Sequence, residues 1–428
     1  MKAVVLAAGE GIRLRPLTFT RPKHLIPICG KTILEHVLTS LKAAGLKEAL
    51  IVVHFMADRF QQLCGDGSKY GMKLEYALQA GVRGTADAAS IAEPYVNEDF
   101  LLIYGDLLVT SDVIDLILRS HEKEKPYASM AVVPVKHPEY YGVVKLDGSY
   151  VTDIVEKPHL KEAPTNWANA GIYVFSTEIF RKIKQTSLSS RGELEITESL
   201  CLLLREKKPV LAVQIPSEEW LDIGRPWDLL EANQRVLSRI KPMVNGQIEN
   251  GARLIGPVTV AEGTRIRSGA YIEGPVFIDE GSDIGPNCFI RPHTYIGKYV
   301  RIGNACEIKN SIIMDKTWIG HLSYVGDSII GEACNFGAGT IVANYRLDEK
   351  TIKVIIKEEV VDSERTKFGV VLGDYVKTGI NTLFMPGVKI GPNSWVGPNV
   401  VVYRDVPSNT FLLSKQGIEQ REINLLSD

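Results

Sequence analysis

The sequence predicts two architectures in one chain: an α/β Rossmann-like domain with a mixed, mostly parallel sheet, followed by a left-handed parallel β-helix of hexapeptide repeats. In residues 1–225, short apolar strands alternate with amphipathic helical patterns, for example KAVVLAA, ILEHVLTSLKAAG and EALIVV. In residues 226–245, PWDLLEANQRVLSRIKP has apolar residues at helical spacing between prolines and predicts a linking helix. In residues 246–428, a period of six predicts the β-helix, with an excursion at 346–367 and a C-terminal tail.

Length and composition limit the class of protein. At 428 residues the chain is long enough for two or three domains. It is 45% hydrophobic and 23% charged with a formal net charge of −2, which is typical of a soluble protein and shows no basic surface for nucleic acid. No stretch approaches the roughly twenty apolar residues of a membrane-spanning helix. We therefore expect neither a nucleic-acid nor a membrane partner.

The opening residues and the cysteines indicate the compartment. MKAVVLAAG is similar to a signal peptide, but GEGIRLRP follows at once, so we interpret it as a buried first strand. Six cysteines without CxxC spacing indicate neither a disulfide framework nor a zinc site. These features fit a reducing cytoplasm.

Two columns of residues repeat every six positions in the second half. One column is aliphatic: Ile248, Leu254, Val260, Ile266, Ile272, Ile278, Ile284, Ile290, Ile296, Ile302 and Ile308. The other, two positions earlier, is small or β-branched and includes Cys288 and Cys306, which we expect to pack in the core. The frame slips near Ile313 and Ile330, and it resumes at Leu372 after the excursion. Two such columns predict stacked coils around a continuous aliphatic core.

The loop after the first strand, LAAGEGIRLRPLTFTRPK, combines glycines with basic side chains. Arg13, Arg15, Arg21 and Lys23 lie close to glycines whose backbone N–H groups can approach an anion. The spacing matches neither the GxGxxG dinucleotide motif nor the Walker lysine motif. The loop predicts a triphosphate site, and a solvated basic turn remains the alternative.

Two aspartates stand where a predicted strand ends or a predicted helix begins. Asp106 in LLIYGDL stands at the expected carboxyl end of a strand, and Asp222 in WLDIG stands just before the predicted linking helix. Carboxylates in such places can hold Mg²⁺ against phosphates. Each could instead be the N-cap of a following helix. Both interpretations stay open from the residues alone.

Motifs of the first half occur in the order found in sugar-1-phosphate nucleotidylyltransferases: GEGIRL, then after seven residues PK, QAGVRGTADA, YGDL, EKP, NAGIY and WLDIG. This half therefore resembles the family of glucose-1-phosphate thymidylyltransferase and N-acetylglucosamine-1-phosphate uridyltransferase. The resemblance implies that Arg13 grips the β,γ-phosphates and Lys23 the α-phosphate and the attacking sugar phosphate. It implies that Asp106 and Asp222 hold Mg²⁺, and that Gln79 with the Gly84 backbone reads a pyrimidine base. The implied nucleotide site is Leu6, Ala7, Ala8, Gly9, Gly11, Gln79, Gly84 and Thr85, and the implied sugar-phosphate site is Gly142, Glu156, Lys157, Asn169 and Gly171.

The stretch GHLSYVGD places a histidine and a tyrosine in the hexapeptide wall. On its own, such a histidine is most often a surface residue without a role. The whole chain, however, resembles bifunctional enzymes that acetylate glucosamine-1-phosphate with acetyl-CoA and then join the product to UTP. That resemblance implies that His321 is the general base for the sugar's 2-amino group, because an ordinary imidazole pKa of roughly 6.5 suits proton transfer near neutral pH. It implies that Asn344 orients the amine or the histidine, that the sugar phosphate contacts Arg291, Lys309, Tyr324, Asn335 and Lys350, and that acetyl-CoA contacts Arg404.

Arg291 and Lys309 are eighteen residues apart, which is three hexads. In a coil of three hexads, one residue then lies directly over the other, about one strand spacing away. Two cations stacked in this way repel unless an anion joins them. We expect a sugar phosphate to be that anion.

The second half departs from the bacterial pattern in several places, including a longer and more charged excursion from Arg346 to Lys367. NYRLD stands where bacterial members usually have NYDG, and the tail LLSKQGIEQREINLLSD does not resemble the bacterial carboxyl arm. These features resemble archaeal-type members, some of which accept galactosamine-1-phosphate as well as glucosamine-1-phosphate, and both UTP and dTTP. The resemblance also implies a homotrimer, or a multiple of it, with the acetyl site between subunits.

Two other interpretations compete with a bifunctional enzyme. One is a monofunctional glucose-1-phosphate thymidylyl- or uridylyltransferase with a structural β-helix. The other is a non-enzymatic regulatory subunit, which the presence of the basic and acidic site residues disfavours.

The remaining histidines show no paired metal-ligand spacing: His24, His36, His54, His121, His137, His159 and His293. We expect packing, and no stacking platform for nucleic acid, from Tyr140, Tyr141, Trp167, Trp220 and Trp395.

Overall fold

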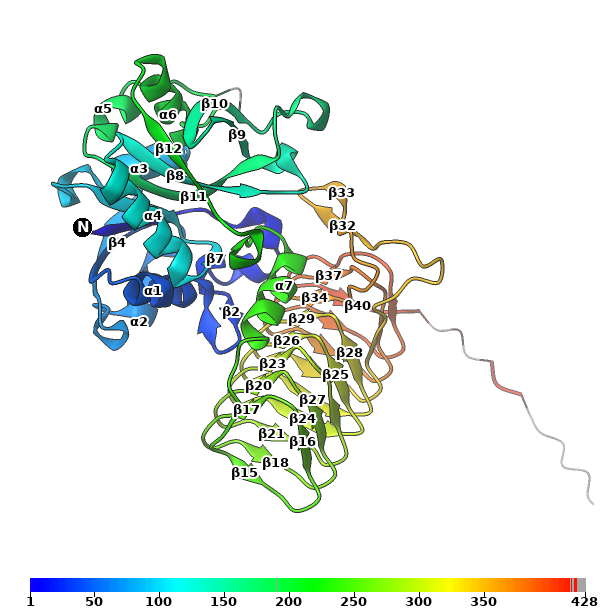
Figure 1. Cartoon of the computed structure of the whole chain (residues 1–428). Coiled ribbons are helices and arrows are strands. Elements are labelled where there is room, and N and C mark those ends of the chain that lie inside the picture. The colour runs from blue at the N-terminus through cyan, green and yellow to red at the C-terminus, as the bar shows by residue number, and fades with distance from the viewer. Residues whose placement is uncertain (190, 416, 418, 422–428) are drawn as a thin grey trace, which may run out of the picture. The chain divides into compact units, whose positions relative to one another are not determined.

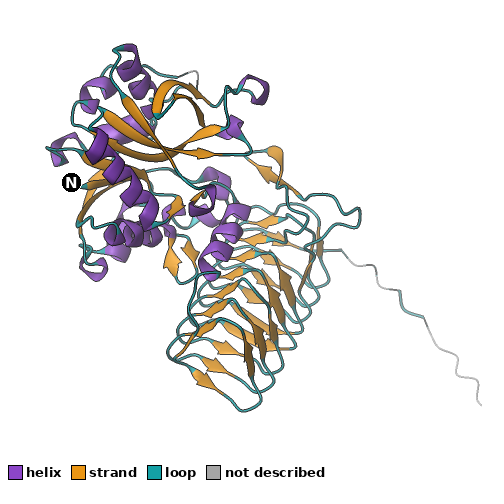
Figure 2. Cartoon of the chain, viewed as in Figure 1, coloured by secondary structure: helices purple, strands orange, loops and turns teal. Residues whose placement is uncertain are grey.

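The structure, a computed structural model, divides into two compact units, Met1–Val236 and Leu237–Asp428 (Figure 1). The residues that it describes are 1–189, 191–415, 417 and 419–421. Part of the predicted C-terminal tail therefore lies outside the described residues. Within the described chain, the α-helices end at Leu237 and the second unit is built of short strands (Figure 2).

A nine-stranded mixed sheet forms the centre of the first unit. Seven strands run in one direction, and only β11 and β10 run against them. The predicted mixed, mostly parallel sheet is confirmed. In spatial order the strands are β5 (Lys73–Leu78), β4 (Glu48–Val53), β1 (Ala3–Ala7), β6 (Phe100–Tyr104), β11 (Trp167–Phe175), β8 (Ala128–Pro134), β12 (Val210–Gln214), β10 (Tyr150–Glu156) and β9 (Gly142–Asp147).

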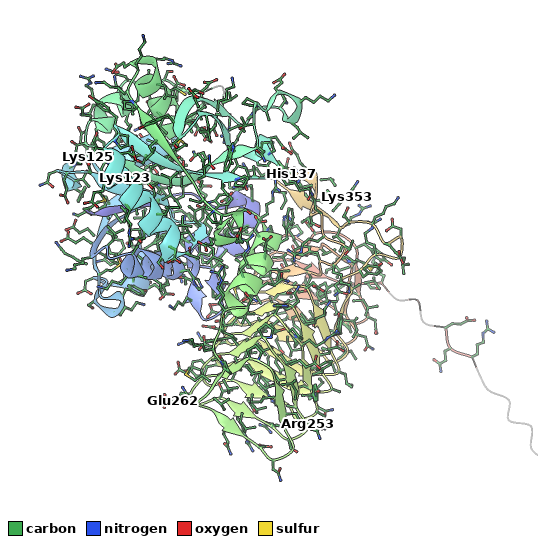
Figure 3. The ribbon with its side chains drawn as sticks, viewed as in Figure 1. Lys123, Lys125, His137, Arg253, Glu262 and Lys353 are labelled. Carbon is green, nitrogen blue, oxygen red and sulfur yellow. The ribbon has the colours of Figure 1, made fainter. Side chains whose placement is uncertain are left out.

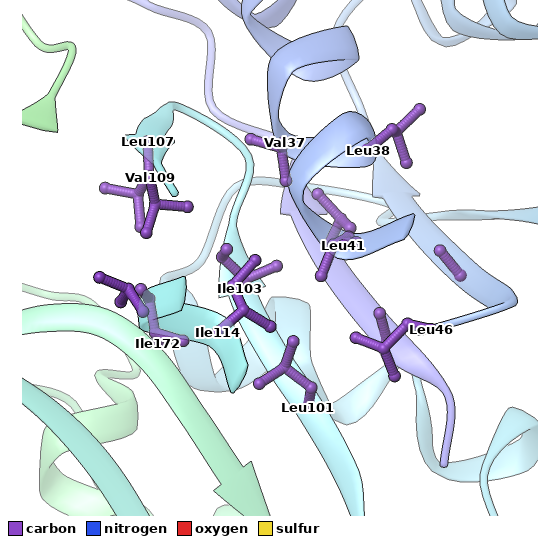
Figure 4. Packing of buried hydrophobic residues seen from close by; sticks show 14 of the residues in the cluster. Val37, Leu38, Leu41, Leu46, Leu101, Ile103, Leu107, Val109, Ile114 and Ile172 are labelled. Carbon is purple, nitrogen blue, oxygen red and sulfur yellow. The ribbon is translucent and has the colours of Figure 1, made fainter. Parts of the chain in front are cut away.

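Helices cover both faces of this sheet. They are α1 (Ile33–Ala43), α2 (Ala57–Cys64), α3 (Thr85–Ser90), α4 (Ser111–Glu124), α5 (Ile179–Ile183) and α6 (Ile196–Arg205), and a further helix, α7 (Pro226–Leu237), follows later in the chain. Side chains of β1 alternate between two cores, because successive strand residues point to opposite faces. Val5 packs with α1 and α4, whereas Val4 packs with α3, α5 and α6. Figure 4 shows Val37 and Leu41 of α1 above Ile103 of β6 in the first of these cores.

Local signals in the sequence set the helix ends. α1 begins with a capping box in which the Thr32 hydroxyl accepts from the Glu35 backbone N–H, while the Glu35 carboxylate accepts from the Thr32 N–H at 2.9 Å. α7 occupies the first part of the predicted linking segment and ends at Leu237. Two short sheets complete the unit: β2 (Pro27–Ile28) with β3 (Lys31–Thr32), and β7 (Leu107–Val109) with β13 (Trp220–Asp222).

Three parallel sheets make up the β-helix of the second unit. The first contains β14 (Met243–Val244), β17 (Val258–Val260), β20 (Val276–Ile278), β23 (Thr294–Ile296), β26 (Ile312–Ile313), β29 (Ile329–Ile330), β34 (Val371–Leu372) and β37 (Lys389–Ile390). The second contains β15 (Gln247–Ile248), β18 (Arg265–Ile266), β21 (Asp283–Ile284), β24 (Arg301–Asn304), β27 (Trp318–His321), β30 (Asn335–Phe336), β35 (Lys377–Thr378), β38 (Trp395–Val396) and β40 (Phe411–Leu412). The third contains β16 (Arg253–Ile255), β19 (Tyr271–Glu273), β22 (Phe289–Ile290), β25 (Glu307–Lys309), β28 (Tyr324–Gly326), β31 (Ile341–Val342), β36 (Leu383–Phe384) and β39 (Val401–Val402).

The register of these sheets follows the hexapeptide period. Ile272 pairs with Ile290, and Ile290 pairs with Ile308, so each coil has eighteen residues. Where the frame slips, Ile296 pairs with Ile313, seventeen residues on, and Ile313 with Ile330. Stacked parallel sheets of this kind agree with the left-handed β-helix that the hexads predict.

The aliphatic column forms one buried core along the β-helix, and it includes Cys288 and Cys306 as predicted. All six cysteines are free thiols. The charged excursion at 346–367 carries an antiparallel hairpin of β32 (Lys353–Ile356) and β33 (Glu359–Asp362). Exposed charged side chains such as Arg253 and Lys353 lie at the surface (Figure 3). Among the described residues, no helix has the length and apolar character needed to span a membrane.

Candidate functional site

A cavity of about 280 Å³ opens in the first unit, where the loops after β1 and β6 meet residues of β9, β10 and β11. Its lining includes most of the side chains predicted for a nucleotide and sugar-phosphate site: Leu6, Ala8, Gly9, Arg13, Lys23, Gln79, Gly84, Thr85, Asp106, Gly142, Glu156, Lys157, Asn169, Gly171 and Asp222. A larger hollow of about 550 Å³ lies at the amino ends of β1, β4 and β6. Its lining is mostly exposed and includes only two buried or half-buried apolar residues, Val96 and Phe100, so the chemistry-bearing residues identify the smaller cavity as the candidate site.

Glycines bring the basic residues close to the loop backbone. Gly11 has a positive φ of 69°, and a Cβ there would lie 2.8 Å from Cβ of Lys23. Gly11 therefore lets the Lys23 side chain pack against the loop. Gly11 and the buried Ala7 are the two residues of the predicted nucleotide site that are not among the residues lining the cavity. Arg13 lies against Gly224, where a Cβ would come within 2.9 Å of the guanidinium. The loop is thus a scaffold for two cations that face one cavity.

Lys23 and Asp106 form an ion pair inside the cavity. Burial is the largest influence on the pKa of Asp106 and would raise it, but the charge and hydrogen bond of Lys23, with smaller contributions that include the Arg13 charge, together hold this pKa below its usual value. For Asp222, burial and the negative charge of Asp106 together raise the pKa of the carboxyl. Two carboxylates that repel each other in a buried cavity have the oxygen ligands that Mg²⁺ prefers, so the residues present fit this ion.

The alternative of helix N-caps is wrong for both aspartates. Asp106 is followed by the strand β7, and Asp222 ends the strand β13. The cap of α7 comes from Asp228, whose carboxylate accepts from the backbone N–H groups of Gly224 at 3.0 Å and Arg225 at 2.7 Å. Both predicted metal ligands are therefore free of that structural role.

Buried hydrogen bonds fix the end of the cavity at Gln79. Nε2 of Gln79 donates to the Asp87 carboxylate at 2.6 Å, and this side chain is 1% exposed. Because a carboxylate only accepts, Asp87 determines which way the Gln79 amide faces. Gly84 has a φ of 119°, and a Cβ there would lie 2.4 Å from the Leu194 carbonyl oxygen. Thr85 accepts from the Ile196 N–H at 2.9 Å, which joins α3 to α6.

The predicted sugar-phosphate residues gather at the other end. Oε2 of Glu156 accepts from the Thr197 hydroxyl at 3.0 Å, and Asn169 donates to the Tyr173 hydroxyl at 2.5 Å. Gly171 has a φ of 72°, and a Cβ there would lie 2.5 Å from the Tyr104 ring. Burial and then the Arg191 charge lower the pKa of Lys157. This end therefore combines hydrogen-bonding groups with a cation that is partly withdrawn from water.

Sequence reasoning missed several lining residues. Glu195 is buried, forms an ion pair with Arg191 at 3.1 Å, and has its pKa raised to about 7 by burial and by the charge of Glu156. In the sequence, Glu195 stands just before α6, where acidic residues are typical of a helix start. His24, predicted to have no role, lines the cavity, and burial and then Lys23 lower its pKa to about 3, so it is neutral there.

The aromatic residues near the cavity pack as predicted and also line it. Tyr141 and Trp220 meet edge to face with their ring centroids 5.8 Å apart. The Trp220 indole N–H donates to the Ala170 carbonyl oxygen at 2.8 Å. Such packing holds β13, and with it Asp222, against β11.

In the second unit the predicted stacking of Arg291 over Lys309 is confirmed. The Arg291 N–H donates to the Ile308 carbonyl oxygen at 2.8 Å, one coil on. The expectation that a sugar phosphate is needed to relieve the repulsion between Arg291 and Lys309 is wrong for the protein without substrate. Arg291 pairs with Glu307 at 2.8 Å and Lys309 with Asp327 at 3.4 Å, so carboxylates of the protein neutralise both cations. These partners were missed because spacing alone says nothing of which side chains meet.

Tyr324, Lys309 and Asn344 are brought together around Asp327. Nδ2 of Asn344 donates to the Tyr324 hydroxyl at 3.2 Å and to Asp327 at 2.5 Å. Burial and the charge of Asp327 raise the pKa of Tyr324, which therefore stays protonated at neutral pH. His321 ends β27 and is exposed, and in the described part of the chain no hydrogen bond joins it to Asn344.

Three other predicted residues lie outside this cluster. Asn335 begins β30, Lys350 lies in the charged excursion, and Arg404 follows β39, and all three are exposed. No ion pair or hydrogen bond between described residues links their side chains to Tyr324 or Asn344. One copy of the chain therefore gathers only part of the set predicted for acetyl transfer.

Comparisons with known proteins find a matching family for each half of the chain. The nucleotidyl transferase family matches residues 2–239, and the GMPPB C-terminal domain matches residues 272–384. The bifunctional protein GlmU of Methanocaldococcus jannaschii is 42% identical over 424 residues, which cover 99% of this chain and 100% of that protein. The chain belongs to the bifunctional GlmU family. A GlmU of Methanococcus maripaludis is 45% identical, with 97% of this chain and 98% of that protein covered.

Further relatives agree with this membership of the GlmU family. A protein of Sulfurisphaera tokodaii named bifunctional sugar-1-phosphate nucleotidylyltransferase/acetyltransferase is 38% identical, with 96% of this chain and 99% of that protein covered. Among solved structures, a Bacillus anthracis protein provisionally named glucose-1-phosphate thymidylyltransferase matches with a TM-score of 0.51 and 30% identity. It covers 57% of this chain and 97% of its own length, so its similarity concerns the nucleotidyltransferase unit. The archaeal-type bifunctional resemblance predicted from the motifs is confirmed.

Proposed function

We propose that this GlmU family member carries out two steps of nucleotide-sugar synthesis. In the first step, the β-helix transfers acetyl from acetyl-CoA to the 2-amino group of glucosamine-1-phosphate or galactosamine-1-phosphate. In the second, the α/β unit transfers UMP or dTMP from UTP or dTTP to a sugar-1-phosphate and releases pyrophosphate. The observation that carries the proposal is the cavity in which Arg13, Lys23, Asp106 and Asp222 meet the predicted sugar residues.

The nucleotidyl step needs no general base, because a sugar-1-phosphate is already an anionic nucleophile. Its phosphate oxygen attacks the α-phosphorus of the nucleotide, and the bond to the β-phosphate oxygen breaks to release pyrophosphate. Lys23 exchanges its contact with Asp106 for the incoming phosphates, and Arg13 holds the β,γ-phosphates. Asp106 and Asp222 would hold Mg²⁺, which neutralises phosphate charge when bound.

The amide orientation at Gln79 favours uracil or thymine. With Nε2 committed to Asp87, the Gln79 oxygen is the atom left to accept from a base. Uracil and thymine carry an N–H at position 3, whereas cytosine has an acceptor there. We infer that the site selects UTP or dTTP and disfavours CTP.

The acetyl step pairs a base with an orienting amide. The amine nitrogen attacks the thioester carbon, His321 takes the proton that the amine gives up, and collapse of the tetrahedral intermediate expels the coenzyme A thiolate. Asn344 accepts from the amine, while Arg291, Lys309, Tyr324, Asn335 and Lys350 bind the sugar phosphate. Arg404 contacts acetyl-CoA.

A homotrimer, or a multiple of it, would complete this second site. The side chains of Ile341, Leu383 and Val401 stand in register on the third sheet, and all three are exposed apolar groups. Such a column is the kind of surface that a second copy covers. Asn335, Lys350 and Arg404 would then reach the acetyl site of a neighbouring copy.

A substrate matrix tests the proposal. Pyrophosphate release would be measured with UTP, dTTP or CTP against glucose-1-phosphate or N-acetylglucosamine-1-phosphate, with and without Mg²⁺, and thiol release with acetyl-CoA and each amino-sugar phosphate. We expect Mg²⁺-dependent release with UTP or dTTP and thiol release with at least one amino sugar. Pyrophosphate without any thiol release would instead support a monofunctional enzyme with a structural β-helix.

A further inference from the structure

Asp327 is a buried carboxylate that the proposed mechanism does not use. It follows β28, and its side chain is 5% exposed. Its Oδ1 accepts from Nδ2 of Asn310 at 2.6 Å, its Oδ2 accepts from Nδ2 of Asn344 at 2.5 Å, and Nζ of Lys309 lies 3.4 Å from Oδ2. A buried carboxylate needs such donors, so these contacts could serve stability alone. Two of the donors, however, belong to residues proposed for substrate binding and catalysis.

The charge of Asp327 determines which way the Asn344 amide faces. An amide can turn over and exchange its oxygen for its nitrogen, and the network around it decides between the two orientations. The Tyr324 hydroxyl accepts or donates equally well and sets no preference. The carboxylate only accepts, so Nδ2 of Asn344 must point to Asp327, with its second hydrogen on the Tyr324 oxygen. Oδ1 of Asn344 then has no donor among the described residues.

The backbone holds this arrangement in place. The N–H groups of Phe368 and Gly369 donate to the carbonyl oxygens of Asn344 at 3.0 Å and Asp327 at 2.8 Å. A Cβ at Gly326 would lie 2.5 Å from the Tyr324 hydroxyl and 2.6 Å from Nδ2 of Asn344, so a larger residue would push both groups apart. The backbone of Phe368 and Gly369 and the close approach at Gly326 therefore leave Asp327 and Asn344 little room to move.

We propose that Asp327 is a positioning residue of the acetyl-transfer site: it orients the Asn344 amide so that Oδ1 accepts from the 2-amino group of the sugar, and it anchors the Lys309 ammonium beside it. The inference rests on the proposed acetyltransferase function. The Tyr324 oxygen accepts from Asn344, which leaves the Tyr324 proton to donate to the sugar phosphate. One carboxylate thus sets the donor and acceptor pattern that the substrate meets.

Asp327→Asn is the suitable variant, because it keeps the shape of the side chain, and asparagine tolerates the positive φ of 51° at this position. With a neutral amide at position 327, neither orientation of Asn344 is enforced. We expect the kcat of thiol release to fall by about 10- to 100-fold, while the KM for acetyl-CoA changes by less than about twofold. Asp374→Asn is the matched control, since Asp374 is also buried and accepts from a backbone N–H, of Glu332, outside the cluster. Its kcat should stay within about twofold of wild type.

The reciprocal exchange Asp327→Asn with Asn344→Asp separates positioning from stability. In that double variant Nδ2 of residue 327 donates to the carboxylate at 344, which still offers an oxygen to the amine. We expect it to recover at least about tenfold of the kcat lost in Asp327→Asn or in Asn344→Asp, and such a non-additive result is the signature of a direct pair. Melting temperature and pyrophosphate release, measured on every variant, report on folding.

Each outcome decides the matter. A double variant that is folded but no faster than the slower single variant would overturn the positioning role. So would wild-type kcat in Asp327→Asn. If the wild-type chain itself releases no thiol with any amino-sugar phosphate, the proposed acetyltransferase function fails, and the role of Asp327 fails with it. Thiol release by wild type, slow singles and a faster double support the inference.

Discussion

The Lys23 ammonium contacts the Asp106 carboxylate in a cavity that also contains Asp222, for which no ion pair is found among the described residues. The cation and the first carboxylate neutralise each other before substrate arrives. In the proposed mechanism, Lys23 moves from Asp106 to the phosphates when they enter, and both carboxylates become available to a divalent cation. The ion pair in the free protein therefore holds the proposed phosphate ligand Lys23 and the proposed metal ligand Asp106 next to each other.

Replacement of Asp106 by asparagine removes this arrangement. We expect Asp106→Asn to lower the rate of pyrophosphate release by at least about 100-fold. The substitution removes the negative charge of the Asp106 carboxylate, which is already in place where the phosphoryl group is transferred. A titration of the rate against Mg²⁺ concentration should also show weaker Mg²⁺ dependence. Asp112→Asn, at an exposed residue of α4, is the control. Equal rates in the two variants would remove Asp106 from the mechanism.

The pKa of Glu195 predicts a pH dependence at the sugar end. Burial and the Glu156 charge raise this pKa to about 7, so Glu195 loses its negative charge as the pH falls through about 7. Less negative charge then faces an anionic sugar phosphate, and the KM for that substrate should fall. Glu195→Gln should match the KM of wild type at pH 6 and keep that low KM at pH 8, where the KM of wild type rises, whereas Glu178→Gln, at an exposed site, should follow wild type. A Glu195→Gln variant with the wild-type pH profile would contradict the assignment.

Alanine substitutions at Gly171 and Gly148 distinguish the cost of backbone strain from the cost of steric contact. Both have positive φ, 72° and 57°, but only Gly171 faces a neighbour within 4 Å, the Tyr104 ring. Alanine should cost about 1 kcal/mol of unfolding free energy at Gly148, from the backbone conformation alone. At Gly171 it should cost a further 1–3 kcal/mol, roughly, from overpacking, and it should raise the KM for sugar phosphate. Urea unfolding of both variants checks this, and equal costs would show that Tyr104 yields without strain.

Periodic and ordered signals in the sequence were enough to predict the fold. The eighteen-residue coil follows from the aliphatic column, since Ile272, Ile290 and Ile308 stack as their spacing requires. The position of Asp106 after a strand could be predicted from the apolar run that precedes it in LLIYGDL. Spacing could not decide between a helix cap and a metal ligand, and only the contact of Asp228 with the start of α7 decides it.

Contacts between side chains that are far apart in the sequence could not be predicted from it. Asp327 stands within the motif GHLSYVGD, but its partners Asn310 and Asn344 are seventeen residues away on either side, and each of those intervals contains a frame slip. Arg191 and Glu195 reach the cavity only because the loop before α6 folds back over Glu156. Such contacts depend on side-chain directions, for which a periodic pattern carries no information.

The most direct measurement compares His321→Ala with Lys23→Ala in two assays on the same protein. Thiol release from acetyl-CoA with an amino-sugar phosphate reports on the β-helix, and pyrophosphate release from UTP with N-acetylglucosamine-1-phosphate reports on the cavity. We predict that His321→Ala loses at least about 100-fold in thiol release and keeps pyrophosphate release, and that Lys23→Ala does the reverse. If His321→Ala leaves thiol release intact, or if one substitution abolishes both activities in a folded chain, the account of two separate sites is contradicted.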